Sequence, residues 1–215
     1  MELSIALVII GLIVSVSASS YVSAAKSGSN ANADVRLAAL SASVLAFVQA
    51  RHRLPCPDSA GNGYEGLVND ACPAGLDVGW LPYLSLDLPQ PASIERAIYG
   101  VYRNPKADLA LAADLSTLTA ASTQAISASY VYLTGDGTST NGPEDCTGNV
   151  SSNPAFVILA PGEDRDGDGN RVDGINQTLP ASGHCFSAPS RKVETNFDDR
   201  TIAVNLYAVM AKLNQ

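Results

Sequence analysis

Apolar residues dominate the first 25 positions, and the rest of the chain alternates short apolar runs with polar loops. After Glu2 no charged residue occurs until Lys26, and the run Ile5 to Val14 is apolar apart from Gly11. An uncharged segment of this length can cross a bilayer as a helix, at about 1.5 Å per residue. The pattern therefore predicts a hydrophobic N-terminal helix over residues 1–25.

Three interpretations of this helix are open. A cleaved signal peptide fits the length, but Glu2 stands where signal peptides carry Lys or Arg. A plain transmembrane anchor also fits the length, although serines fill much of the second half. A helix that lies first in a membrane and later in the core of a protein assembly gives Glu2 a role. A buried carboxylate requires a cation, and an α-amino group is one that a neighbouring chain can supply.

A second helical segment is predicted up to about residue 54. Residues 26–33 contain glycine and two asparagines, which favours a weak or flexible joint there, with Asp34 as the helix cap. Pro55 should end the helix, because the residue before a proline avoids the helical conformation. The apolar positions that recur at helical spacing, and that we expect to pack on a sheet, are Leu37, Leu40, Val44 and Val48.

Residues 55–215 have the pattern of a globular domain. Alternating or continuous apolar runs predict strands over residues 98–102, 128–133, 155–160 and 201–206. Helical spacing favours helices within residues 106–126 and over the last ten residues. The expected fold class is α+β, with a long N-terminal helix packed on a small antiparallel sheet of about four strands.

Composition narrows the function classes. The formal net charge is −8 and the sequence pI is about 4.6, which argues against nucleic-acid binding, because phosphates require a basic face. The four cysteines form no CxxC pair, and behind an export-type N-terminus they predict two disulfides and an oxidising compartment. Four cysteines allow three pairings, and the spacing alone does not choose among them.

An acidic loop is the best candidate for a metal site. Acids alternate from residue 163 to residue 173, and the pattern D-x-D-x-D-G matches the first half of an EF-hand calcium loop. The twelfth position is Ile175 rather than Glu, so the loop is not an intact EF-hand. The alternative is a solvated acidic turn whose charge is partly balanced by Arg165 and Arg171. The calcium ligands that the sequence predicts are Asp164, Asp166, Asp168, Asn170 and Asp173.

Nothing in the sequence indicates catalysis. Neither a phosphate-binding glycine loop nor a nucleophile-elbow motif is present. His184 adjoins Cys185, but a lone pair lacks the spacing of a zinc site. We therefore expect no catalytic residues and a protein that is not an enzyme. Asn149 and Asn176 begin formal N-glycosylation sequons.

Three stretches carry a family resemblance. The segment ELSIALVIIGLI, from Glu2 to Ile13, resembles the N-terminal segment of type IV pilins and type II secretion pseudopilins. RLPCP at residues 53–57, with LPYLSLDLP at residues 81–89, resembles a subgroup of pilin-like proteins, as does NFDDR at residues 196–200. Family members place a glutamate five residues into the mature chain, whereas here it is the second residue.

The resemblance implies a pilin-like fold and a structural role. Glu2 matches the family's glutamate, which would neutralise the N-terminal amine of a neighbouring subunit, and Gly11 matches a glycine where such helices lose helical order. The N-terminus of such subunits is methylated after a short leader is removed. With proximity in the sequence, the resemblance favours the pairing Cys56–Cys72, which leaves Cys146–Cys185.

The expected function is that of a filament subunit. Such a chain waits in the inner membrane and then polymerises into an extracellular filament, with pilus or secretion machinery as its partner. The alternatives are a minor pilin or periplasmic pseudopilin of an assembly machine, and a membrane-anchored binding module that never polymerises.

Overall fold

The structure is a computed structural model that describes residues 31–147, 153–165 and 167–214. Contacts divide the chain into residues 1–36 and residues 37–215, and the architecture below is that of the second unit. Glu2, Gly11 and the helix expected over residues 1–25 lie outside the described residues.

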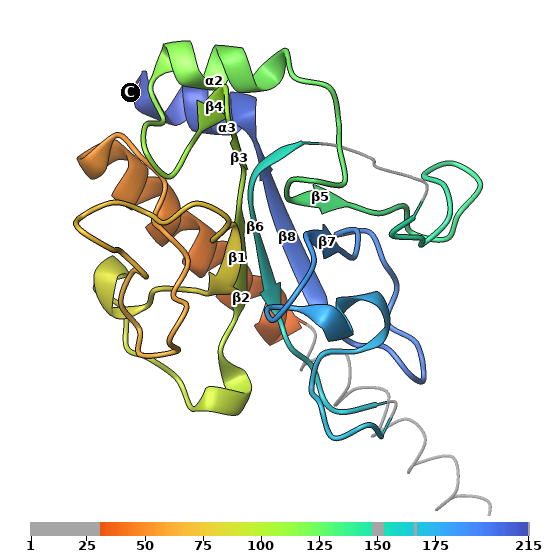
Figure 1. Ribbon diagram of the computed structural model, residues 1–215. Helices are drawn as coiled ribbons and strands as arrows, with labels where there is room; N and C mark the ends of the chain where they lie inside the picture. Colours follow the sequence, from red (N-terminus) through yellow and green to blue (C-terminus); the bar gives the residue numbers. More distant parts are fainter. Residues whose placement is uncertain (1–30, 148–152, 166, 215) are drawn as a thin grey trace, which may run out of the picture. The chain divides into compact units, whose positions relative to one another are not determined.

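A four-stranded antiparallel sheet forms the centre of the domain (Figure 1). Its strand order is β1-β2-β6-β8, so the neighbouring strands β2 and β6 come from distant parts of the chain. The register pairs Tyr99 with Ile158 and Ile158 with Ile202. The strands of this sheet are β1 (Val78–Trp80), β2 (Ile98–Val101), β6 (Pro154–Ala160) and β8 (Arg200–Asn205).

Shorter elements surround this sheet. The strands β3 (Arg103–Asn104) and β4 (Ala107–Asp108) form a hairpin, and β5 (Tyr132–Leu133) pairs in parallel with β7 (Cys185–Phe186). The helices are an N-terminal helix (Ala31–Arg51), α2 (Leu115–Ser122) and α3 (Leu206–Leu213), with 3-10 turns η1 (Leu84–Leu86), η2 (Ser93–Glu95) and η3 (Gly174–Thr178).

The sheet separates two hydrophobic clusters, because alternate residues of a strand point to opposite faces. The larger cluster contains Phe156 and Ile158 of β6 together with the buried stripe of the N-terminal helix, α2 and α3. The smaller one contains Val157 and Leu159 with residues of the second half of the chain. Gly100 is required here, since a Cβ atom would lie 2.9 Å from the Phe186 ring. Figure 1 shows the N-terminal helix and the β5–β7 region on opposite sides of the sheet.

Local signals in the sequence explain where the helices start and stop. Asp114 and Asn205 cap α2 and α3, each accepting a backbone N–H at 2.8 Å. The N-terminal helix ends at Arg51, and His52 follows it with a φ of 55° in the left-handed region. The predicted stop before Pro55 is confirmed by the end of the helix at Arg51. The predicted stripe is also confirmed, because the side chains of Leu37, Leu40, Val44 and Val48 are all buried.

The sequence-based assignment was wrong in several places. Residues 31–33, expected in the joint, are already helical, so Asp34 lies inside the helix rather than at its cap. One α-helix, α2, forms within the region 106–126, but it starts only at Leu115, because a hairpin held by Asn104 and Asp108 occupies the beginning of this region. The strand expected over residues 128–133 shortens to β5 and lies outside the main sheet.

Candidate functional site

The motif RLPCP anchors the exit from the N-terminal helix. Arg53 Nη2 donates to Glu65 Oε2 at 2.9 Å, and the Cys56 N–H donates to Glu65 Oε1 at 2.6 Å. Leu54 is fully buried, and its N–H donates to the Leu109 carbonyl at 2.8 Å. The Cys56–Cys72 disulfide, with a Cα–Cα distance of 5.5 Å, then closes the loop. The motif residues that carry the family resemblance therefore fix a loop at the end of a helix.

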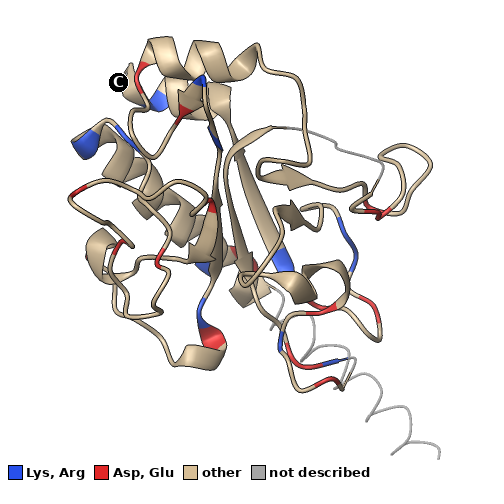
Figure 2. Cartoon of the chain, in the orientation of Figure 1, with Lys and Arg blue, Asp and Glu red and all other residues tan. Residues whose placement is uncertain are grey.

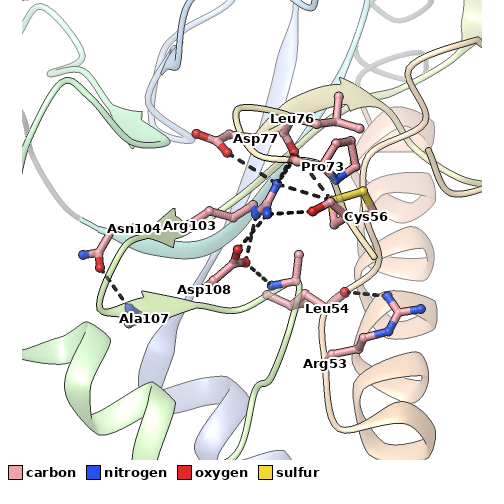
Figure 3. Close-up of polar contacts among 12 residues, drawn as sticks. Arg53, Leu54, Cys56, Pro73, Leu76, Asp77, Arg103, Asn104, Ala107 and Asp108 are labelled. Carbon is pink, nitrogen blue, oxygen red and sulfur yellow. Dashed lines mark hydrogen bonds and ion pairs between the residues drawn. A yellow bond between two sulfur atoms is a disulfide. The ribbon is translucent and has the colours of Figure 1, made fainter. Parts of the chain in front are cut away.

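Arg103 is the main polar contact of this loop (Figure 3). Its side chain is 7% exposed, and its Nε and Nη2 atoms donate to the two carboxylate oxygens of Asp108 at 2.8 and 2.7 Å. Its other N–H groups donate to carbonyl oxygens of the loop, those of Cys72 at 3.2 Å, Pro73 at 2.7 Å and Leu76 at 3.2 Å. One guanidinium thus ties the β3–β4 hairpin to the first disulfide loop.

Asp77 links this hub to the other disulfide. Asp77 Oδ1 lies 3.8 Å from Arg103, and its Oδ2 lies 3.3 Å from His184 Nε2. Cys185 forms the disulfide Cys146–Cys185, with a Cα–Cα distance of 5.9 Å. The structure thus contains both disulfides in the pairing favoured from the sequence. The contact of His184 with Asp77 holds the segment 180–184, which precedes Cys185.

The acidic loop curls around one of its own carboxylates. Asp164 Oδ1 accepts the Gly167 N–H at 2.8 Å, and its Oδ2 accepts the Gly169 N–H at 3.0 Å. Asp168 accepts the Asn170 N–H at 2.7 Å, and both carboxylates are exposed. Asp166, which the sequence predicted as a ligand, lies outside the described residues. Figure 2 shows acidic positions gathered on the loops beside η3.

Asp173 belongs to a different, buried cluster. Its ligand atoms lie within 4.8 Å of those of Asp198 and Asp199. The Asp173 N–H donates to Asp199 at 2.9 Å, and the Asp198 N–H donates to Asp173 at 3.1 Å. Arg165 pairs with this cluster, with its Nε 2.6 Å from Asp198 Oδ2. The structure therefore separates Asp173 from the exposed Asp164 and Asp168 and ties it to NFDDR.

Backbone N–H groups of the acidic loop donate hydrogen bonds to the other two carboxylates of this cluster. The N–H groups of Gly162 and Glu163 donate to Asp199 at 3.1 Å and to Asp198 at 3.0 Å. A Cβ atom at Gly162 would overlap the Asp198 carboxylate, so only glycine allows this approach. Asn176 is buried and donates to Asp199 at 2.9 Å, so its sequon is not accessible. The cluster fastens the acidic loop to the start of β8.

We expect stability to depend on pH through Asp199. Burial raises the pKa of Asp199 to about 7, and the Asp173 charge adds to the rise. Between the unfolded value of about 4 and this pKa, the folded protein keeps a proton that the unfolded chain has released. Stability should therefore be fully present below pH about 4 and fall, by up to about 4 kcal/mol, as the pH rises through 7. Urea unfolding at several pH values measures this slope.

The matched variant is Asp199→Asn, which cannot titrate. Its slope of unfolding free energy between pH 5 and 7 should be flatter than that of the parent chain, whatever its absolute stability. Equal slopes in the two proteins would show that Asp199 is ionised throughout this range.

Calcium at the acidic loop stays a prediction. The loop presents Asp164 and Asp168 to solvent, which leaves their carboxylates reachable by a cation. A chelator should then lower the melting temperature, and added Ca²⁺ at millimolar concentration should restore it, as in weak extracellular sites. Asp168→Asn should abolish the response, whereas Asp70→Asn, in another exposed acidic loop, should keep it. A melting temperature unchanged by chelator would contradict the prediction.

Two sets of residues escaped the sequence analysis. Arg103 directly follows the strand expected over residues 98–102, and Asp108 lies in the region where helices were expected, although an Arg and an Asp five residues apart across a turn are a usable signal. Asp198 and Asp199 were noted only as part of a motif, and adjacent acids beside the buried Phe197 are the signal there. In the described part of the chain, these polar groups hold loops together. Comparisons with protein-family models, with curated proteins and with solved structures found no match for this chain.

Proposed function

We propose that this chain is a structural subunit of a type IV pilus-like filament, which polymerises through its N-terminal helix and has a pilin-like fold. The observation that supports the proposal is the outward face of that helix. One stripe of the helix is buried in the domain, and the opposite face remains exposed and apolar.

The exposed face suits close helix packing. No charged residue occurs from Leu37 to Ala50, and Figure 2 shows the middle of the helix free of charge. Small side chains let two helix backbones approach closely. The exposed alanines are Ala38, Ala39, Ala42, Ala46 and Ala50.

A recess adjoins the same face. Ala46 and Ala50 line a cavity of about 300 Å³ between the helix and η1. In the filament we propose, this recess receives a side chain from a neighbouring subunit. Burying one Ile, Leu or Val side chain contributes roughly 1.5–3 kcal/mol, so a few such contacts per subunit stabilise an assembly.

The proposal includes a membrane stage before assembly. By length and composition, Ala31–Arg51 could cross a membrane, a test that signal sequences and buried core helices pass as well. Because one stripe of this helix is buried in the domain, the anchor in the inner membrane that we propose is the apolar segment 1–25, and two disulfides support a domain outside the cytoplasm. A minor pilin or pseudopilin that primes an assembly machine is the alternative, which the long polar loops favour.

The proposal predicts that Glu2→Ala impairs filament assembly. In the filament we propose, the Glu2 carboxylate pairs with the N-terminal amine of a neighbouring subunit. Without this carboxylate, the amine would be buried unpaired. The domain of residues 37–215 should keep its melting temperature, because Glu2 lies in the other unit. Filament yield by electron microscopy measures the effect, with Glu95→Ala, an exposed acid on η2, as the control. Normal filament yield from Glu2→Ala would rule out this role for Glu2.

A further inference from the structure

A cavity of about 410 Å³ lies between the two disulfide-closed loops, away from the helix face described above. Its floor is the edge strand β1, and its walls are the segments 58–59 and 75–76 on one side and 180–184 on the other. The volume lies within the range of about 300–1,000 Å³ that is usual for small-ligand sites.

Both walls are held rigidly. The first wall lies beside the Cys56–Cys72 disulfide, and the second runs directly into Cys185 of the other disulfide. The His184–Asp77 contact, with Nε2 3.3 Å from Oδ2, joins the second wall to the residue before β1. A site that is formed before the ligand arrives avoids part of the entropic cost of binding.

The lining contains no lysine or arginine, and the residues that line the cavity all lie in the described part of the chain. Asp58 is buried beside the cavity, and its carboxylate accepts the N–H groups of Ala60, Gly61 and Gly63 at 2.6–2.9 Å. A phosphate or carboxylate ligand would therefore find no Lys or Arg among the lining residues to pair with, so the lining suits a neutral ligand better.

The lining offers an aromatic surface and neutral polar groups. Trp80 is only half-buried, with one side packed on the smaller hydrophobic cluster, and it lines the cavity. Ser59, Ser182 and His184 supply groups that donate and accept hydrogen bonds. Gly75 and Gly183 have positive φ angles and no side chains, so the backbone beside them stays accessible.

An extended peptide fits this edge poorly. Adding a strand requires a run of unpaired backbone groups along β1. Trp80, however, already exchanges hydrogen bonds with Asp58, N–H to carbonyl at 2.9 Å in each direction. Only Val78 is left to pair on the outer edge of this three-residue strand.

We propose that this cavity binds a neutral sugar ring, either a free monosaccharide or the terminal residue of an uncharged glycan. A pyranose has an apolar C–H face for the indole of Trp80. Its hydroxyl groups match the serine, histidine and backbone groups of the two walls. The site would give the protein a ligand in addition to its proposed structural role, and it does not depend on polymerisation.

Fluorescence provides a direct test, because Trp80 is the single tryptophan of the chain. The full chain is purified in a zwitterionic detergent without a sugar headgroup and titrated with glucose, galactose, mannose and N-acetylglucosamine. At least one should cause a saturable change in Trp80 emission with a Kd of about 0.1–10 mM. Glucuronate, which has a carboxylate in place of the C6 hydroxymethyl group of glucose, should bind at least about tenfold more weakly than glucose or not at all.

Matched variants separate binding in the cavity from other effects. Ala181→Leu fills an exposed position of the cavity wall and should weaken sugar binding by about tenfold or more. Ala125→Leu, exposed outside the cavity, should leave it unchanged, and Ser182→Ala tests the same wall by removing only a hydroxyl. No saturable change with any of the four sugars would overturn the proposal. A Kd in both Ala181→Leu and Ser182→Ala that equals that of the parent chain would also overturn it, as would tighter binding of glucuronate than of glucose.

Discussion

Ala42→Glu is expected to abolish filament assembly while leaving the domain folded. Ala42 is exposed at the middle of the uncharged face of the N-terminal helix. In the filament we propose, this face meets other helices, and a carboxylate buried there without a cation costs several kcal/mol in every subunit. In the separate subunit the side chain lies in solvent, so the melting temperature should change little.

The control places the same charge on another helix. Ala211→Glu introduces a carboxylate at an exposed position of α3, so assembly should continue if charge by itself is harmless. Ala42→Ser keeps the side chain small and should also assemble. Filaments counted by electron microscopy, at equal amounts of folded subunit, give the comparison. Normal filaments from Ala42→Glu would mean that this helix face is not the assembly surface.

Arg103→Met should lower the free energy of unfolding by about 3–5 kcal/mol. The substitution keeps an unbranched apolar stem in the buried position but removes the donors to Asp108 and to three carbonyl oxygens of the first disulfide loop. Asp108 and Asp77 would then lack the cation that faces them. Removing one partner from a buried ion pair is costly because the remaining charge is left uncompensated.

Urea unfolding with both disulfides intact, followed by Trp80 fluorescence, measures this loss. Lys106→Met removes an exposed charge from the same hairpin and should change the unfolding free energy by no more than about 0.5 kcal/mol. A loss below about 1 kcal/mol in Arg103→Met would show that the loop is held by its disulfide and packing rather than by the guanidinium.

The long regular elements were predictable because their signals are local. The spacing of Leu37, Leu40, Val44 and Val48 marks a helix face, and the continuous apolar run 155–160 marks a strand that is buried on both faces. Pro55 marks where the helix stops. Each of these assignments depends on residues within a few positions of each other.

The contacts between distant segments were not predictable in this way. β1 is three residues long, and it is a strand because it pairs with β2 and with Asp58. Arg103 meets carbonyl groups about 30 residues earlier, and Asp199 meets Gly162 at a separation of 37. A single sequence gives no measure of such pairings, so the acidic loop was predicted as a single site, although Asp164 and Asp168 are exposed and Asp173 is buried with Asp198 and Asp199.

Electron microscopy of native material from the cell surface tests the central claim most directly. The account predicts helical filaments whose core is a bundle of N-terminal helices, with the face from Ala38 to Ala50 in contact with neighbouring subunits. Single particles, or filaments in which this face points to solvent, would contradict it.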